Sequence, residues 1–172
     1  MKELPQKITD EIQNLRSVTD ERGKPIDEKT LLIIAALHAH NFKTTLSCAG
    51  HVKNKRQPWV EIEASDAPTL LKKMQDGAHD GQEFLDNRRA LVNANRGETT
   101  RLYQLLNEFY SSHTTDYTTI LTLDERGPGY ARLTPHNAPF IGSELSEEDF
   151  AVWLEQAQAE VDAFAGFLVG RL

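Results

Sequence analysis

The chain has 172 residues, the size of one domain whose hydrophobic core can fold without disulfides. Its hydrophobic content of 39% and charged content of 26% are those of a globular protein and exclude a wholly disordered chain. A net charge of −7 argues against bulk nucleic-acid binding, because phosphate binding needs a concentrated basic surface.

Three further features predict a cytoplasmic protein that does not enter a membrane. The longest apolar run, Leu31–Leu37, is much shorter than the roughly 18 residues of a membrane span. The first residues, Met1–Lys7, lack the apolar core of a signal peptide. Cys48 is the single cysteine and cannot form an internal disulfide, which fits a reducing compartment.

The first third of the chain predicts two helices and a β-hairpin. Apolar residues three and four positions apart indicate a helix over Pro5–Ser17. Asp27 can cap a second, largely buried helix over Glu28–Asn41. The strand-like segment Thr44–Cys48 and the alternating segment Trp59–Ala64 then predict a hairpin whose turn carries the cysteine.

The middle of the chain predicts helices separated by breaks. A helix is expected over Pro68–Gln75, with proline in its first turn. His79-Asp80-Gly81 suggests a loop, and the residues after it permit a helix. Gly97 is expected to interrupt that helix before a clearer one over Glu98–Ser112.

The remaining segments complete an α+β pattern. A second hairpin is expected over Tyr117–Leu133, followed by a proline-containing linker over Pro135–Ser143. Ser146 and the three acids after it are typical of a helix start, and an apolar stripe then continues for six turns. We therefore predict a single domain over residues 1–172, an antiparallel sheet of two β-hairpins with helices packed mainly on one face and a long C-terminal helix.

Chemically active side chains concentrate at the turn of the first hairpin, where Cys48 and His51 flank Gly50. Glycine adopts positive φ easily, so a tight turn can bring the thiol and the imidazole to one ligand. They could supply two ligands to zinc, but two are too few. A third ligand would come from another acid brought close by folding or from one of four named residues: His38, His40, His136 or Asp66.

Two other chemistries fit the same turn. His51 could activate Cys48 as a nucleophile, with Ser47 beside it, which would make the turn a catalytic site. Alternatively, the turn amides and the Ser47 hydroxyl could bind an anionic small molecule without a reactive sulfur. Gly50 would let the ligand approach the backbone, and three cations would orient it: Lys53, Lys55 and Arg56.

Structural explanations compete with each of these assignments. A lone cysteine is usually a small buried apolar residue, so Cys48 can be a core residue. Trp59 could stack on a ligand or pack in the core, and Arg132 could hold an anion or lie on the surface. His38 and His40 are two positions apart on a helix, so they point to different faces and need share no site.

The residues around the turn carry a resemblance to known proteins. The pattern Thr44-x-x-Ser47-Cys48-x-Gly50-His51, followed by Pro58-Trp59-Val60, resembles an uncharacterised bacterial family with a Ser-Cys-x-Gly-His loop before a Pro-Trp-Val strand. That resemblance covers residues 26–62 and implies no established activity.

The same loop is more distantly similar to that of the tRNA wybutosine-synthesising methyltransferases, which reads Ser-Cys-Ser-Gly-Arg. The matching positions are Ser47, Cys48 and Gly50, and His51 stands where that family has arginine. This likeness implies an RNA-modifying methyltransferase.

The C-terminal helix offers an alternative without catalysis. If its apolar stripe exceeds what one small sheet can cover, the chain is an interaction module that forms a homodimer or binds another protein. The stripe consists of Phe150, Trp153, Leu154, Ala157, Val161, Phe164 and Leu168.

Overall fold

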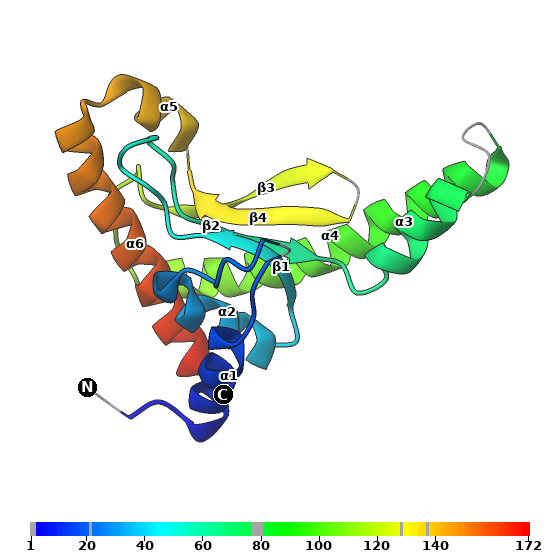
Figure 1. The fold of residues 1–172 in the computed structure, drawn as a ribbon, viewed down its shortest axis with the longest axis horizontal. Helices are drawn as coiled ribbons and strands as arrows, with labels where there is room; N and C mark the ends of the chain where they lie inside the picture. The colour runs from blue at the N-terminus through cyan, green and yellow to red at the C-terminus, as the bar shows by residue number, and fades with distance from the viewer. Residues whose placement is uncertain (1–2, 21, 77–80, 128, 137) are drawn as a thin grey trace.

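The computed structural model describes residues 3–20, 22–76, 81–127, 129–136 and 138–172. Its centre is a four-stranded antiparallel sheet with the order β1-β2-β4-β3 (Figure 1). The two predicted hairpins are both present, and the pairing of β2 with β4 joins them into one sheet. The strands are β1 (Lys43–Cys48), β2 (Trp59–Glu63), β3 (Leu121–Gly127) and β4 (Tyr130–Pro135).

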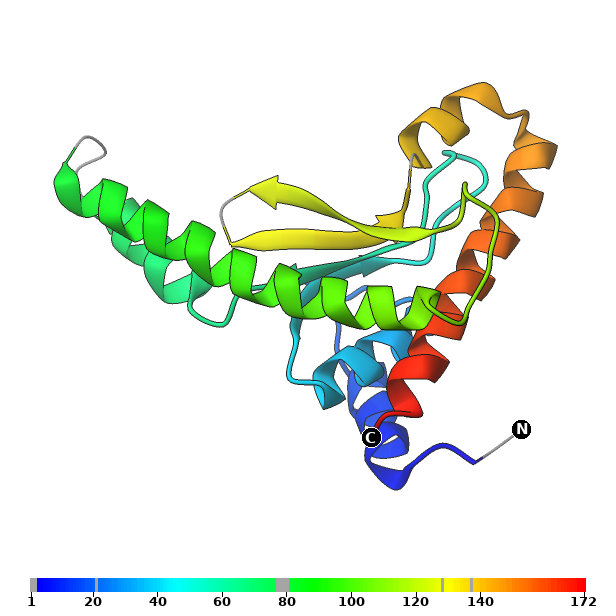
Figure 2. The ribbon, with the colours of Figure 1, turned by 180° about the vertical axis from the view of Figure 1, so that it is seen from behind.

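The helices gather mainly on one side of this sheet, as Figures 1 and 2 show. The pair α3 and α4 extends beyond the sheet as an arm (Figure 1). The predicted fold class, α+β with a long C-terminal helix, is confirmed. The helices are α1 (Gln6–Arg16), the short 3₁₀ helix η1 (Glu28–Thr30), α2 (Leu31–Ala39), α3 (Ala67–Asp76), α4 (Gln82–Tyr110), α5 (Ala138–Glu144) and α6 (Glu147–Val169).

The alternation of residues along β2 and β4 explains which face the helices cover. Val60, Ile62 and Leu133 are buried and belong to the main hydrophobic core, together with residues of α2, α4 and α6. Alternate positions on the same strands are polar, including Glu61 paired with Arg132. Because successive strand residues point to opposite faces, one face of the sheet packs on helices and the other carries polar pairs.

The helix α4 corrects the prediction of a break at Gly97. It runs without interruption for 29 residues, from Gln82 to Tyr110, and Gly97 lies inside it. Its buried side chains Leu91, Leu102 and Leu106 fall on one face along most of its length. Packing of that stripe outweighs the roughly 1 kcal/mol that one glycine costs a helix. Of the predicted loop His79-Asp80-Gly81, the first two residues lie outside the described part of the chain.

Replacing Gly97 by alanine should stabilise the protein by about 0.5–1 kcal/mol, because alanine loses less backbone entropy in a helix. The position is exposed, and a Cβ built there meets no atom within 4 Å. Urea denaturation followed by circular dichroism measures the change. An unchanged or lower free energy of unfolding would show that the helix is not continuous at this point.

The segment expected to be a linker contains α5 instead. Ala138 is buried in a small cluster with Phe150, Trp153, Leu154 and Ala157. This contact with α6 favours a helical turn where the prolines and glycine predicted irregular structure. The predicted start of α6 is confirmed, since the Ser146 hydroxyl accepts a hydrogen bond of 3.1 Å from the Asp149 amide. Among the described helices, none is long and apolar enough to cross a membrane.

The apolar stripe of α6 is covered by the chain itself. All seven stripe residues are buried, and α6 packs chiefly against α2. The stripe therefore offers little area to a second molecule. A homodimer stays a prediction, and it would have to use a different surface.

Candidate metal centre

A tight turn closes the first hairpin immediately after the cysteine. Strand β1 ends at Cys48, and three residues further on His51 pairs with Arg56. The His51 amide donates to the Arg56 carbonyl at 2.9 Å, and the Arg56 amide donates back at 3.0 Å. These bonds fix the position at which the His51 side chain leaves the backbone. The predicted placement of Cys48 and His51 at the turn end of the hairpin agrees with this geometry.

Gly50 makes the short path between the thiol and the imidazole possible. Its φ of +87° lies in the left-handed region that glycine occupies without penalty. A Cβ there would come within 2.5 Å of Leu154 Cδ1 and 2.8 Å of the Arg56 carbonyl oxygen. The Gly50 amide also donates to Cys48 Sγ at 3.4 Å. This bond orients the sulfur and would stabilise a thiolate.

Asp27 joins the turn from the segment before η1. Its carboxylate caps no helix amide, contrary to the prediction, and instead accepts a hydrogen bond of 3.2 Å from the Ala49 amide. That bond holds the carboxylate against the turn. One carboxylate oxygen of Asp27, the Cys48 sulfur and one ring nitrogen of His51 all lie within 4.8 Å of one another. Folding therefore supplies an acid as the third candidate ligand.

The three histidines proposed as the third ligand have other partners. His38 lies between Glu11 and Thr44, and His40 contacts the Leu168 carbonyl oxygen. His136 contacts the Tyr117 hydroxyl. None of these three imidazoles belongs to the Asp27–Cys48–His51 group.

Asp66, the fourth residue proposed as third ligand, is exposed and precedes α3. It is not a member of the cluster either.

The donor set of Asp27, Cys48 and His51 suits zinc. Zn²⁺ binds thiolate, imidazole and carboxylate at about 2.0–2.3 Å, so tetrahedral ligand atoms are about 3.3–3.8 Å apart. The observed separations are at most 4.8 Å, so the three groups would need to close by no more than about 1.5 Å to bind one ion. Three protein ligands would leave one tetrahedral position for water or another molecule.

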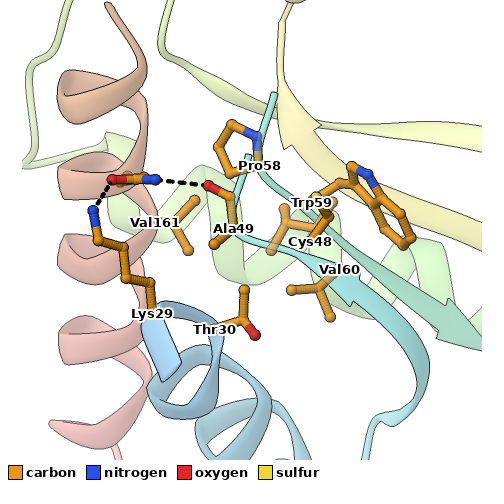
Figure 3. Close-up of a pocket in the computed structure, with 10 residues that line it drawn as sticks. Lys29, Thr30, Cys48, Ala49, Pro58, Trp59, Val60 and Val161 are labelled. Carbon is orange, nitrogen blue, oxygen red and sulfur yellow. Dashed lines mark hydrogen bonds between the residues drawn. The ribbon is translucent and has the colours of Figure 1, made fainter. Parts of the chain in front are cut away.

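The space available to a fourth ligand of the metal differs between the two pockets beside the turn. On one side, Cys48 lines a cavity with Ala49 and Trp59, drawn in Figure 3. Its volume of about 10 Å³ holds about one water molecule. On the other side, Asp27 and Ser47 line a groove of about 700 Å³. A ligand larger than water would therefore approach from the groove and not from the cavity.

The small cavity is closed by a hydrogen-bonded pair from two helices. The Lys29 ammonium donates to the Gln158 side-chain carbonyl at 2.6 Å, and the Gln158 amide donates to the Ala49 carbonyl at 2.7 Å. These bonds, drawn as dashed lines in Figure 3, tie η1 and α6 to the turn. They hold the backbone of the turn in place beside Cys48.

The three cations predicted to orient an anion, Lys53, Lys55 and Arg56, differ in whether their side chains are already bonded within the protein. The Lys55 ammonium donates to the Leu145 carbonyl and is partly buried, so it serves the turn itself. Lys53 and Arg56 are exposed, and in the described part of the chain their side chains have no hydrogen-bond or ion-pair partner. Lys53 and Arg56 therefore remain available to an anionic ligand.

Ser47, Trp59 and Arg132, for which ligand roles were among the predictions, each contact other residues of the chain. The Ser47 hydroxyl lies 3.2 Å from that of Thr30 and lines the large groove, while Cys48 lines the small cavity. The guanidinium of Arg132 lies 3.9 Å from the ring centre of Trp59 and donates to Glu61 at 3.0 Å. Because Glu61 balances its charge, Arg132 does not offer a free cation to an anion.

Comparison with protein-family models, curated proteins and solved structures finds no match to this chain. The likeness to the bacterial family with the Ser-Cys-x-Gly-His loop and the likeness to the tRNA methyltransferases stay predictions.

Proposed function

We propose that the protein binds a divalent transition metal ion, with Zn²⁺ the best chemical match, through Asp27, Cys48 and His51. The observation that carries this proposal is the convergence of a carboxylate, a thiol and an imidazole from two segments of the chain within 4.8 Å. Each is a known zinc ligand, and together they number one fewer than a closed structural site requires.

An open fourth position favours a reactive metal over a structural one. A bound Zn²⁺ would lower the pKa of a coordinated water towards neutrality and so provide a hydroxide nucleophile. Asp27 lines the groove of about 700 Å³, which gives a substrate room beside this position. Exposed Lys53 and Arg56 would attract an anionic small molecule to the turn.

Titration of the purified protein with Co²⁺ tests the proposal directly. Cobalt replaces zinc in tetrahedral sites, and its bond to thiolate absorbs in the near ultraviolet. We expect one equivalent to bind, the absorption to appear, and one equivalent of Zn²⁺ to abolish it. Affinity should fall as the pH is lowered, because protons compete for the thiolate and the imidazole. Binding without the thiolate absorption would exclude Cys48 as a ligand and overturn the proposal.

A further inference from the structure

A second group of reactive side chains includes His38 and Thr44, which line the same large groove as Asp27. Glu11 comes from α1, His38 from α2 and Thr44 from β1. The Glu11 Oε1 atom is 2.6 Å from His38 Nδ1, and Thr44 Oγ1 is 2.8 Å from His38 Nε2. A carboxylate, an imidazole and a hydroxyl are thus connected in line.

The direction of these hydrogen bonds follows from what each group can donate. An ionised carboxylate only accepts, so the proton between Glu11 and a neutral His38 belongs to Nδ1. The Nε2 atom then has a lone pair and accepts a hydrogen bond from the Thr44 hydroxyl. This is the order of groups in an acid–histidine–hydroxyl triad, in which the imidazole takes the hydroxyl proton as that oxygen attacks.

The arrangement is also accessible to a substrate. His38 and Thr44 both line the groove of about 700 Å³, and about 30% of the His38 side chain is exposed. The pairing of β1 with β2 is irregular between Thr44 and Ser47. Irregularities of this kind redirect side chains and are common beside active sites. If the Thr44 hydroxyl served only to connect β1 to α2 in the core, it would not be expected to border a groove.

We propose that Thr44 is the nucleophile of an esterase activity in this groove. Thr44 Oγ1 attacks the carbonyl carbon of a carboxylic ester, and its proton passes to His38 Nε2. The carbon–oxygen bond to the alcohol then breaks, and the alcohol leaves with that proton. Water attacks the resulting acyl-threonine, His38 takes the water proton and returns it to Thr44, and the carboxylic acid is released. Glu11 is a positioning residue that fixes the imidazole.

The groove also indicates which esters it takes. Arg22 and Lys24 line it and are exposed, so a negatively charged acyl or alcohol group would be attracted there. Asp20 Oδ1 accepts hydrogen bonds from both of their amides, at 2.9 and 2.8 Å. Anionic esters are therefore the expected substrate class. The proposal is independent of the metal centre, since none of its three groups belongs to the Asp27–Cys48–His51 cluster.

A fluorophosphonate probe tests the nucleophile. Attack by Thr44 displaces fluoride and leaves a stable phosphonyl ester, which peptide mass spectrometry locates. We expect one label per chain, at Thr44, and unchanged labelling in the presence of chelator. Thr44→Ser should keep the label, and His38→Gln should slow it about 100-fold or more, because a general base contributes about 10²–10⁴-fold. Hydrolysis of p-nitrophenyl acetate should fall by a similar factor in His38→Gln.

Thr45→Val is the matched control. Thr45 lines the same groove, but its hydroxyl donates to Glu61 at 3.0 Å, and no histidine among the described residues is hydrogen-bonded to it. Labelling and ester hydrolysis should survive in this variant and be lost in Thr44→Val, with both variants folded by circular dichroism. Absence of a label at Thr44, or labelling that is unchanged in His38→Gln, would show that the three groups serve only to connect α1, α2 and β1.

Discussion

Replacing Cys48 by serine should weaken Zn²⁺ binding by at least about 100-fold and abolish the thiolate absorption of the Co²⁺ form. Serine keeps the size of the side chain, so the buried position stays filled, but a neutral hydroxyl is a poor zinc ligand. Loss of partners that only orient a ligand already costs about 10–100-fold in metal affinity, and loss of a ligand should cost more. Isothermal titration calorimetry with Zn²⁺ measures the change.

Two aspartates provide the matched comparison for this experiment. Asp27→Asn should also weaken binding, because an amide oxygen is a weaker ligand while it can still accept the Ala49 hydrogen bond. Asp66→Asn should leave affinity unchanged, since Asp66 lies outside the cluster. Equal affinities for the Asp27 and Asp66 variants would contradict the assignment of Asp27. Wild-type affinity in the Cys48 variant would remove the basis for a metal centre at this turn.

Asp27 is also the clearest example of what the sequence does not reveal. Cys48 and His51 are close in the chain, and the residues between them predict a tight turn. The proximity of these two ligands can therefore be predicted from the sequence. Asp27 is 21 positions before Cys48 and precedes a helix, where an aspartate usually caps. Its contact with Ala49 depends on how η1 packs against the hairpin. No local pattern encodes that packing, and the sequence predicts only that some acid brought close by folding can be the third ligand.

The fold was more predictable than the site, because hydrophobic periodicity determines it over long segments. Both hairpins and the start of α6 follow from alternation, turn residues and capping. Two errors in the predicted helices, at Gly97 and at α5, share a cause. The average local preferences of glycine and proline predict irregular structure at both places, whereas the buried stripe of α4 and the contact of Ala138 with α6 determine the local structure.

Replacing Gly50 by alanine should destabilise the protein by about 2–5 kcal/mol. Part of the cost is backbone strain, about 1–2 kcal/mol for an L-residue in the left-handed region. The rest comes from overpacking, typically 1–3 kcal/mol, because the new methyl group would overlap Leu154 and the Arg56 carbonyl. The midpoint of urea denaturation should fall accordingly.

Gly23→Ala separates these two contributions. Gly23 also has positive φ, +73°, but a Cβ there meets no atom within 4 Å. This variant should therefore lose only the strain, about 1–2 kcal/mol, and should bind Zn²⁺ normally. Gly50→Ala, in contrast, should weaken Zn²⁺ binding even where it remains folded, because relief of the overlap moves His51 relative to Cys48. If both variants lose the same stability and keep the same affinity, the close approach at Gly50 does not position the ligands.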